Sequence, residues 1–102
     1  MLTQIEKNIN GWLDILEQKA KIQTYGSQNI YFIFKRNPKY YKIIVVWDGD
    51  ESIHAFVDKK NGDVYKPASW SAPYKDARYN LITEYDKILN NCDWAGVYLY
   101  KS

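Results

Sequence analysis

The chain has 102 residues, enough for one domain around one hydrophobic core and too few for two. Apolar residues make up 46% of it, which excludes global disorder. No apolar run approaches the roughly 18 residues of a membrane-spanning helix, and the N-terminus lacks the features of a secretory signal. Because Cys92 is the single cysteine, no internal disulfide is expected. We therefore expect one domain, residues 1–102, in the cytoplasm.

Charge and aromatic content favour a binding protein over an enzyme. Basic and acidic residues nearly balance, 14 against 12, although residues 35–78 hold nine of the basic and six of the acidic ones. Aromatic residues make up 17% of the chain, and ten of these 17 are tyrosines. Tyrosine combines a large apolar ring with a polar end, so it suits half-exposed surfaces and interfaces.

The first predicted element is a helix that begins after Thr3 and fades by Thr24. Thr3 and Glu6 have the spacing of a capping box. An apolar stripe at three- and four-residue spacing follows, made of Ile5, Ile9, Trp12, Leu13, Leu16 and Ala20. Gly11 costs this helix about 1 kcal/mol relative to alanine, which suggests a bend or a close contact there. Gly26 is the expected stop.

Four strands are expected next, because β-branched and aromatic residues alternate with turn signals. The turns are Arg36–Lys39, Asp48–Glu51 and Asn61–Gly62. The strands are residues 30–35, 40–47, 52–57 and 64–66. Consecutive strands joined by tight turns predict an antiparallel meander.

The rest of the chain is expected to form a loop, a helix and a strand. Residues 67–76 contain two prolines and predict a loop. A second helix is expected with Asp76 as its N-cap and an apolar stripe of Ala77, Leu81, Tyr85, Ile88 and Leu89. Trp94–Tyr100 is expected to be the last strand. The predicted fold class is α+β: a four- to five-stranded antiparallel meander sheet with an N-terminal helix and a second helix before the last strand.

No pattern of catalytic residues is recognisable. His54 is the only histidine, and we interpret it as a sheet-face residue rather than as a general base. Cys92 has no second cysteine at metal or redox spacing and is expected to be a buried structural residue. No phosphate-binding glycine loop, zinc motif or nucleophile elbow is present in the sequence. We therefore expect no enzymatic activity, no metal and no cofactor.

The segment 64–80 carries the candidate binding residues, because cationic and aromatic side chains are concentrated in it. Cations can hold phosphates, and aromatic faces can stack on bases. Arg78 is expected in the first turn of the second helix, whose amides also favour an anion. The candidate ligand-binding residues are Tyr65, Lys66, Ser69, Trp70, Tyr74, Lys75, Arg78 and Asn80. The structural alternative is that Trp70 closes one end of the core and the lysines are merely solvated.

The same segment resembles a signature of a family of small tailed-phage proteins. The matching residues follow the pattern FVDKxxGDVYKxASWxAPxKxxRxN over residues 56–80. Small phage proteins with an aromatic and basic loop and no catalytic set look like the viral anti-CBASS sponges. That resemblance implies a homo-oligomer, a dimer or tetramer, that captures a cyclic dinucleotide or related immune signal in the host cytoplasm without cleaving it.

Two other classes of function use the same residues. A module that binds single-stranded nucleic acid would stack bases on the aromatic residues, although a net charge of +2 argues mildly against it. A protein–protein inhibitor or virion component would use the tyrosine-rich surface as an interface.

Overall fold

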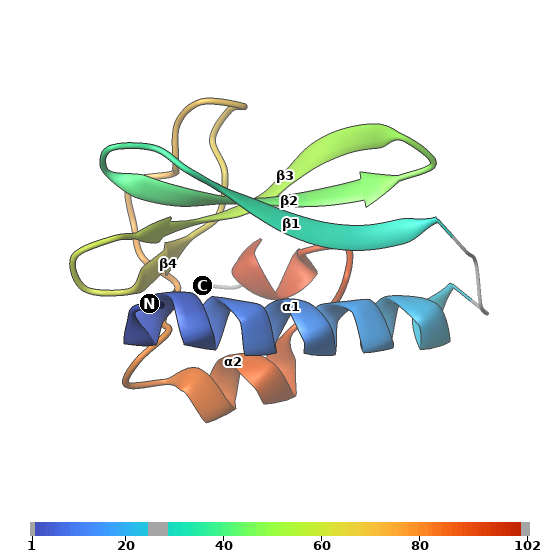
Figure 1. The fold of residues 1–102 in the computed structure, drawn as a ribbon, viewed down its shortest axis with the longest axis horizontal. Helices are drawn as coiled ribbons and strands as arrows, with labels where there is room; N and C mark the ends of the chain where they lie inside the picture. The colour runs from blue at the N-terminus through green and yellow to red at the C-terminus, as the bar shows by residue number, and fades with distance from the viewer. Residues whose placement is uncertain (1, 25–28, 101–102) are drawn as a thin grey trace.

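The computed structural model describes residues 2–24 and 29–100 and opens with a long helix, α1, Gln4–Gln23 (Figure 1). Thr3 is its N-cap, and both hydrogen bonds of the predicted capping box are present between Thr3 and Glu6. Thr24 caps the C-terminus, so the predicted bounds are confirmed. Gly26, the expected stop, lies outside the described residues.

Five antiparallel strands follow in a meander, each hydrogen-bonded to the next along the chain. They are β1 (Ile30–Arg36), β2 (Tyr40–Trp47), β3 (Asp50–Asp58), β4 (Asp63–Tyr65) and β5 (Tyr79–Asn80). The predicted α+β class and the meander are confirmed. The fifth strand, however, precedes the second helix rather than following it.

The main core lies between one face of the sheet and α1 (Figure 1). The pairing register places Tyr41, Val57 and Val64 side by side on this inner face, and all three are buried. The alternate residues Lys42, Phe56 and Tyr65 share the outer face, which is turned away from α1. A second, short helix, α2 (Tyr85–Asn91), packs against the far side of α1 (Figure 1).

The predicted second helix is wrong in its first half. The segment after Asp76 does not begin a helix; instead, Tyr79 and Asn80 pair with Val64 and Asp63 of β4. The amides of Arg78 and Leu81 donate to the oxygens of Val64 and Gly62, whereas the Asn80 amide donates to Glu84 Oε1. The Asn80 Oδ1 then accepts hydrogen bonds from the amides of residues 82 and 83, which holds a turn before the helix begins at Tyr85.

The predicted last strand, Trp94–Tyr100, is also wrong. Residues Val97–Tyr100 form a 3₁₀ helix, η1. Gly96 has a positive φ of 84°, and the Asp93 carboxylate accepts hydrogen bonds from the amides of Val97 and Tyr98 at 3.0 and 3.1 Å. These contacts fold the chain into a tight turn rather than an extended strand.

Two contacts join the helices to each other. The Lys19 Nζ donates to the backbone oxygens of Leu89 and Cys92 at 2.9 and 2.7 Å, which satisfies carbonyls at the C-terminus of α2. Gly11 faces Tyr85, and a Cβ atom at Gly11 would overlap the tyrosine hydroxyl. The glycine therefore allows the close contact that its position in α1 suggested. Within the described residues, no helix is long and apolar enough to cross a membrane.

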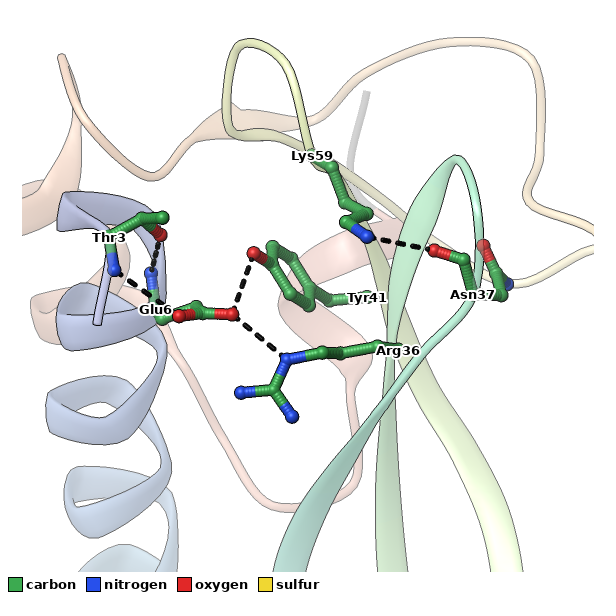
Figure 2. Close-up of polar contacts among 6 residues, drawn as sticks. All are labelled: Thr3, Glu6, Arg36, Asn37, Tyr41 and Lys59. Carbon is green, nitrogen blue, oxygen red and sulfur yellow. Dashed lines mark hydrogen bonds and ion pairs between the residues drawn. The ribbon is translucent and has the colours of Figure 1, made fainter. Parts of the chain in front are cut away.

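A polar network ties the start of α1 to the β1–β2 hairpin (Figure 2). The Glu6 Oε2 accepts hydrogen bonds from Arg36 Nε at 2.9 Å and from the Tyr41 hydroxyl at 3.0 Å. The hydrogen bond from Arg36 lowers the pKa of Glu6, as do those from the Thr3 amide and the Tyr41 hydroxyl. Beside it, Lys59 Nζ donates to a carbonyl of the turn that joins the two strands. Glu6 thus completes the N-terminal capping box of α1 and also attaches the helix to the β1–β2 hairpin.

Candidate functional site

The loop between β4 and β5, residues 66–78, is an ordered hairpin-like projection. The Tyr74 amide donates to the Lys66 oxygen at 2.8 Å, and Pro67 and Pro73 form the next bridge. Nearer the tip, the amides of Ala68 and Ser69 both donate to the oxygen of residue 72. The loop rises on the side of the sheet away from α1 (Figure 1). Its internal hydrogen bonds make its side chains partly preorganised for a ligand.

Trp70 lies at the tip of this loop and is not part of the core. Half of its side chain is exposed (50%), which excludes the alternative that it closes the end of the core. The Lys42 Nζ, from the outer face of the sheet, lies 4.6 Å from the centroid of the Trp70 ring. The loop and β2 thus place a cation beside a half-exposed aromatic surface.

Lys66 and Tyr74 form a second cluster with Tyr100 of η1. The Lys66 Nζ lies 4.3 Å from the Tyr74 ring centroid and 4.6 Å from that of Tyr100. Both tyrosines are exposed, Tyr74 to 38% and Tyr100 to 55%. The arrangement again sets one ammonium group against accessible aromatic rings.

Arg78 lies before β5 and not in a helix, so the expected contribution of a helix N-terminus is wrong. It is half-buried and its Nε is shielded from solvent. Among the described residues, Arg78 Nε has no hydrogen-bond partner, and the side chain takes part in no ion pair. Because Nε is enclosed, an external anion would have to meet the terminal amino groups of this guanidinium, which forms no ion pair with another described residue.

The remaining predicted residues differ in their availability. Tyr65 is half-buried on the outer face, edge-on to Tyr40 at 6.2 Å. Lys75 is exposed, and the Ser69 hydroxyl accepts a weak hydrogen bond from the amide of residue 71 at 3.4 Å. Asn80 is different, because its side-chain groups are already used within the fold. Its Nδ2 donates to Asn61 O and to an Asp63 oxygen, both at 2.9 Å.

Sequence reasoning missed Lys42 and Tyr100 as members of the candidate site. Lys42 is the only charged residue in the otherwise apolar and aromatic stretch 40–47, and this interruption was a usable signal. Tyr100 belongs to the predicted last strand, and that prediction gives no reason to expect a contact with Lys66. The loop side chains thus form two cation–aromatic clusters with residues of β2 and η1, Lys42–Trp70 and Lys66–Tyr74–Tyr100. No described cation–aromatic contact includes Arg78.

His54 and Cys92 lie in the interior. A bulge in β3 turns His54 toward the core, where it packs edge-on against Trp12 and Phe32. Its Nε2 is 2.7 Å from the Tyr98 hydroxyl, and burial lowers the pKa of His54 to about 4. Cys92 is buried, and burial raises the pKa of its thiol. Within the described residues there is no group of three or more potential metal ligands.

Fold and loop together define a small α+β domain with an exposed aromatic and basic hairpin loop. The chain belongs to the family of unknown function DUF7717, whose model matches residues 1–101. No curated protein and no solved structure matches it.

Proposed function

We propose that this protein binds a nucleotide through the 66–78 loop and sequesters it without cleaving it. The observation that carries the proposal is the half-exposed Trp70 ring with Lys42 Nζ 4.6 Å from its centroid. A base stacked on a tryptophan contributes about 1–3 kcal/mol. Lys42 Nζ lies over one face of the ring, so a base would stack on the other face, and the ammonium is placed to hold a phosphate of the ligand.

The second cluster supports a ligand with two bases and two phosphates. Lys66 lies between the rings of Tyr74 and Tyr100, so it repeats the combination of one cation with exposed aromatic surface. Arg78 supplies a further cation without an internal acceptor among the described residues. A cyclic dinucleotide carries two bases and two phosphates, so it could use both clusters, and Asn80 is not required for it.

A second copy of the chain would complete the site. The loop projects from the sheet, so a ligand on Trp70 needs another wall to be enclosed, and pockets bury most of the surface of a tightly bound small ligand. Together with the resemblance of residues 56–80 to small tailed-phage proteins, this favours a homo-oligomeric sponge that captures a host immune signal. Single-stranded nucleic acid and a protein partner are the competing ligands that the experiment separates.

The test is calorimetry and thermal unfolding with a panel of nucleotides. The panel contains cyclic dinucleotides, cyclic trinucleotides, cyclic signals derived from NAD, and short oligonucleotides. A ligand at 100 times its dissociation constant stabilises the fold by about 2.7 kcal/mol. We expect one cyclic nucleotide to do so and to be recovered intact by chromatography after long incubation.

Other outcomes would overturn the proposal. An affinity that grows with oligonucleotide length and falls steeply with salt indicates a single-strand binder instead. If every nucleotide leaves the melting temperature unchanged, the loop is an interface for a protein. A hydrolysed or linearised product would show that the protein is an enzyme.

A further inference from the structure

A cavity of about 450 Å³ lies between the β2–β3 turn and the segment that leads into η1. Its size is within the range of small-molecule sites. The loop that carries Trp70 does not contribute to its described walls. The lining residues that matter here are Trp47, Asp48, Asp50, His54 and Trp94.

Two tryptophans that pack edge to face against each other line this cavity. The ring centroids of Trp47 and Trp94 are 4.9 Å apart, with an angle of 81° between the ring planes. Trp47 is 40% exposed although it is one of the largest apolar side chains in the protein. The electron-rich face of a tryptophan attracts organic cations more strongly than any other side-chain ring.

The charge of the cavity is opposite to that of the loop. Asp48 and Asp50 are exposed at the β2–β3 turn and supply two carboxylates, while no lysine or arginine is among its described lining residues. Neither aspartate forms an ion pair with another described residue. The phosphates of a nucleotide would be repelled here, whereas a cation would be attracted.

His54 adds one uncharged polar group. It is 96% buried, since its exposed fraction is 4%, and its Nε2 is engaged with Tyr98. The other edge of the ring, Nδ1 and Cε1, faces Gly96, which also lines the cavity. This edge of the ring lies on the side of Gly96, where Nδ1 could bond a polar group of a ligand.

From these contacts we propose that the cavity binds a quaternary or methylated ammonium group, with Trp47 and Trp94 as the aromatic walls and Asp48 and Asp50 as the counter-charge. An alkylated ammonium needs no hydrogen bonds to its cationic centre, so aromatic faces and nearby carboxylates satisfy it. Tyr100 of the Lys66 cluster also lines this cavity, so the two sites adjoin there. The ammonium proposal nevertheless rests on other residues, Trp47, Trp94, Asp48 and Asp50, and on the opposite charge.

The experiment compares choline with 3,3-dimethyl-1-butanol, its uncharged isostere, by calorimetry and by NMR of the indole N–H groups. We expect choline to bind at least about fivefold more tightly than the isostere, because only choline is attracted by the rings and carboxylates. Its signal changes should concentrate on Trp47 and Trp94 and spare Trp70. Capped trimethyl-lysine serves as a second probe. If it binds more tightly than choline, the natural ligand is a methylated lysine side chain; if it binds more weakly, the natural ligand is a free small molecule.

Matched variants make the result decisive. The double variant Asp48→Asn, Asp50→Asn should weaken choline binding about fivefold. Asparagine suits position 48, where φ is +52°. Trp47→Ala should reduce binding further, whereas Trp70→Ala should leave it unchanged. Equal affinity for choline and the isostere, no choline binding to the wild-type chain, or choline binding unaffected by the aspartate changes would overturn the proposal.

Discussion

Variants of Trp70 and Arg78 distinguish a ligand-binding role of these residues from a purely structural one, because the two roles predict opposite effects on affinity and stability. For Trp70→Ala we expect nucleotide affinity to fall about 5- to 150-fold, because one stacked base is worth about 1–3 kcal/mol. Arg78→Ala should cost at least as much, since it removes a charge-assisted hydrogen bond to a phosphate. Calorimetry with the nucleotide identified in the panel measures both effects.

The control for these variants is Trp47→Ala, which removes a comparably exposed tryptophan at the end of β2, outside the 66–78 loop. It should retain full nucleotide affinity. Trp70→Ala itself should change the melting temperature little, because half of the side chain is already in water. A loss of about 3–5 kcal/mol, the cost of truncating a core aromatic residue, would show that Trp70 serves packing instead.

Asn80 is expected to serve stability rather than binding. Its Oδ1 accepts two backbone amides and its Nδ2 donates to Asn61 and Asp63. Asn80→Ala should lower the free energy of unfolding by about 1–3 kcal/mol, because four hydrogen bonds are lost, of which the one to Asp63 is part-buried and the other three are exposed. Urea denaturation measures this, with Asn90→Ala on the exposed end of α2 as control. An unchanged urea midpoint for Asn80→Ala would contradict the structural role.

At the level of secondary-structure elements, the contact between α1 and α2 depends on Gly11. Alanine is the better helix former by about 1 kcal/mol, but its Cβ would overlap the Tyr85 hydroxyl, and such overpacking costs about 1–3 kcal/mol. We expect Gly11→Ala to destabilise the protein in thermal unfolding. Adding Tyr85→Phe should restore most of the loss, and Asn10→Ala at an exposed site should be neutral. A Gly11→Ala variant more stable than wild type would contradict the contact.

The attachment of α1 to the β1–β2 hairpin should depend on pH through Glu6. Its pKa is lowered in the folded state, so its contribution is present above the ordinary glutamate value of about 4.3 and is lost as pH falls through the folded-state value. Glu6→Gln should therefore reduce stability at pH 7 and flatten its fall toward pH 3. Urea denaturation across this range measures both.

The matched control is Glu51→Gln. Glu51 is exposed and forms only a 3.7 Å ion pair with Lys35, so its loss should have little effect. If the Glu6 and Glu51 variants showed the same acid dependence as wild type, the Glu6 network would not stabilise the fold.

For the whole molecule, the exposed aromatic surface predicts self-association. Among the described residues, five aromatic residues are at least 38% exposed, namely Tyr31, Trp47, Trp70, Tyr74 and Tyr100. Exposed aromatic side chains are favoured at protein interfaces. We expect a dimer or tetramer by light scattering at low micromolar concentration, and the Trp70→Ala variant should shift the assembly toward the monomer. A mass of 12.1 kDa for the wild type would contradict this.

The helix α1 and the four-strand meander could be predicted because local signals specify them. The capping box of Thr3 and Glu6, the 3.6-residue apolar period and the Asn61–Gly62 turn each act within a few residues. The segment after residue 76 could not be predicted in this way. This segment has the apolar period of a helix, but Tyr79 and Asn80 pair with β4 instead. That pairing depends on a strand more than ten residues earlier in the chain, so the local pattern does not determine it.

The features of the candidate site can likewise be separated into those set by local sequence and those set by tertiary contacts. Sequence alone determined that residues 65–78 combine cations with aromatic rings, because composition is local, and that Cys92 has no second cysteine as a partner. Only the tertiary structure decided which cation meets which ring. It brought Lys42 to Trp70 and Tyr100 to Lys66, used Asn80 inside the fold, and placed Trp47, Asp48 and Trp94 around one cavity. These contacts join separate strands and turns, and their partners are selected by sheet register and packing, which no short stretch of sequence encodes.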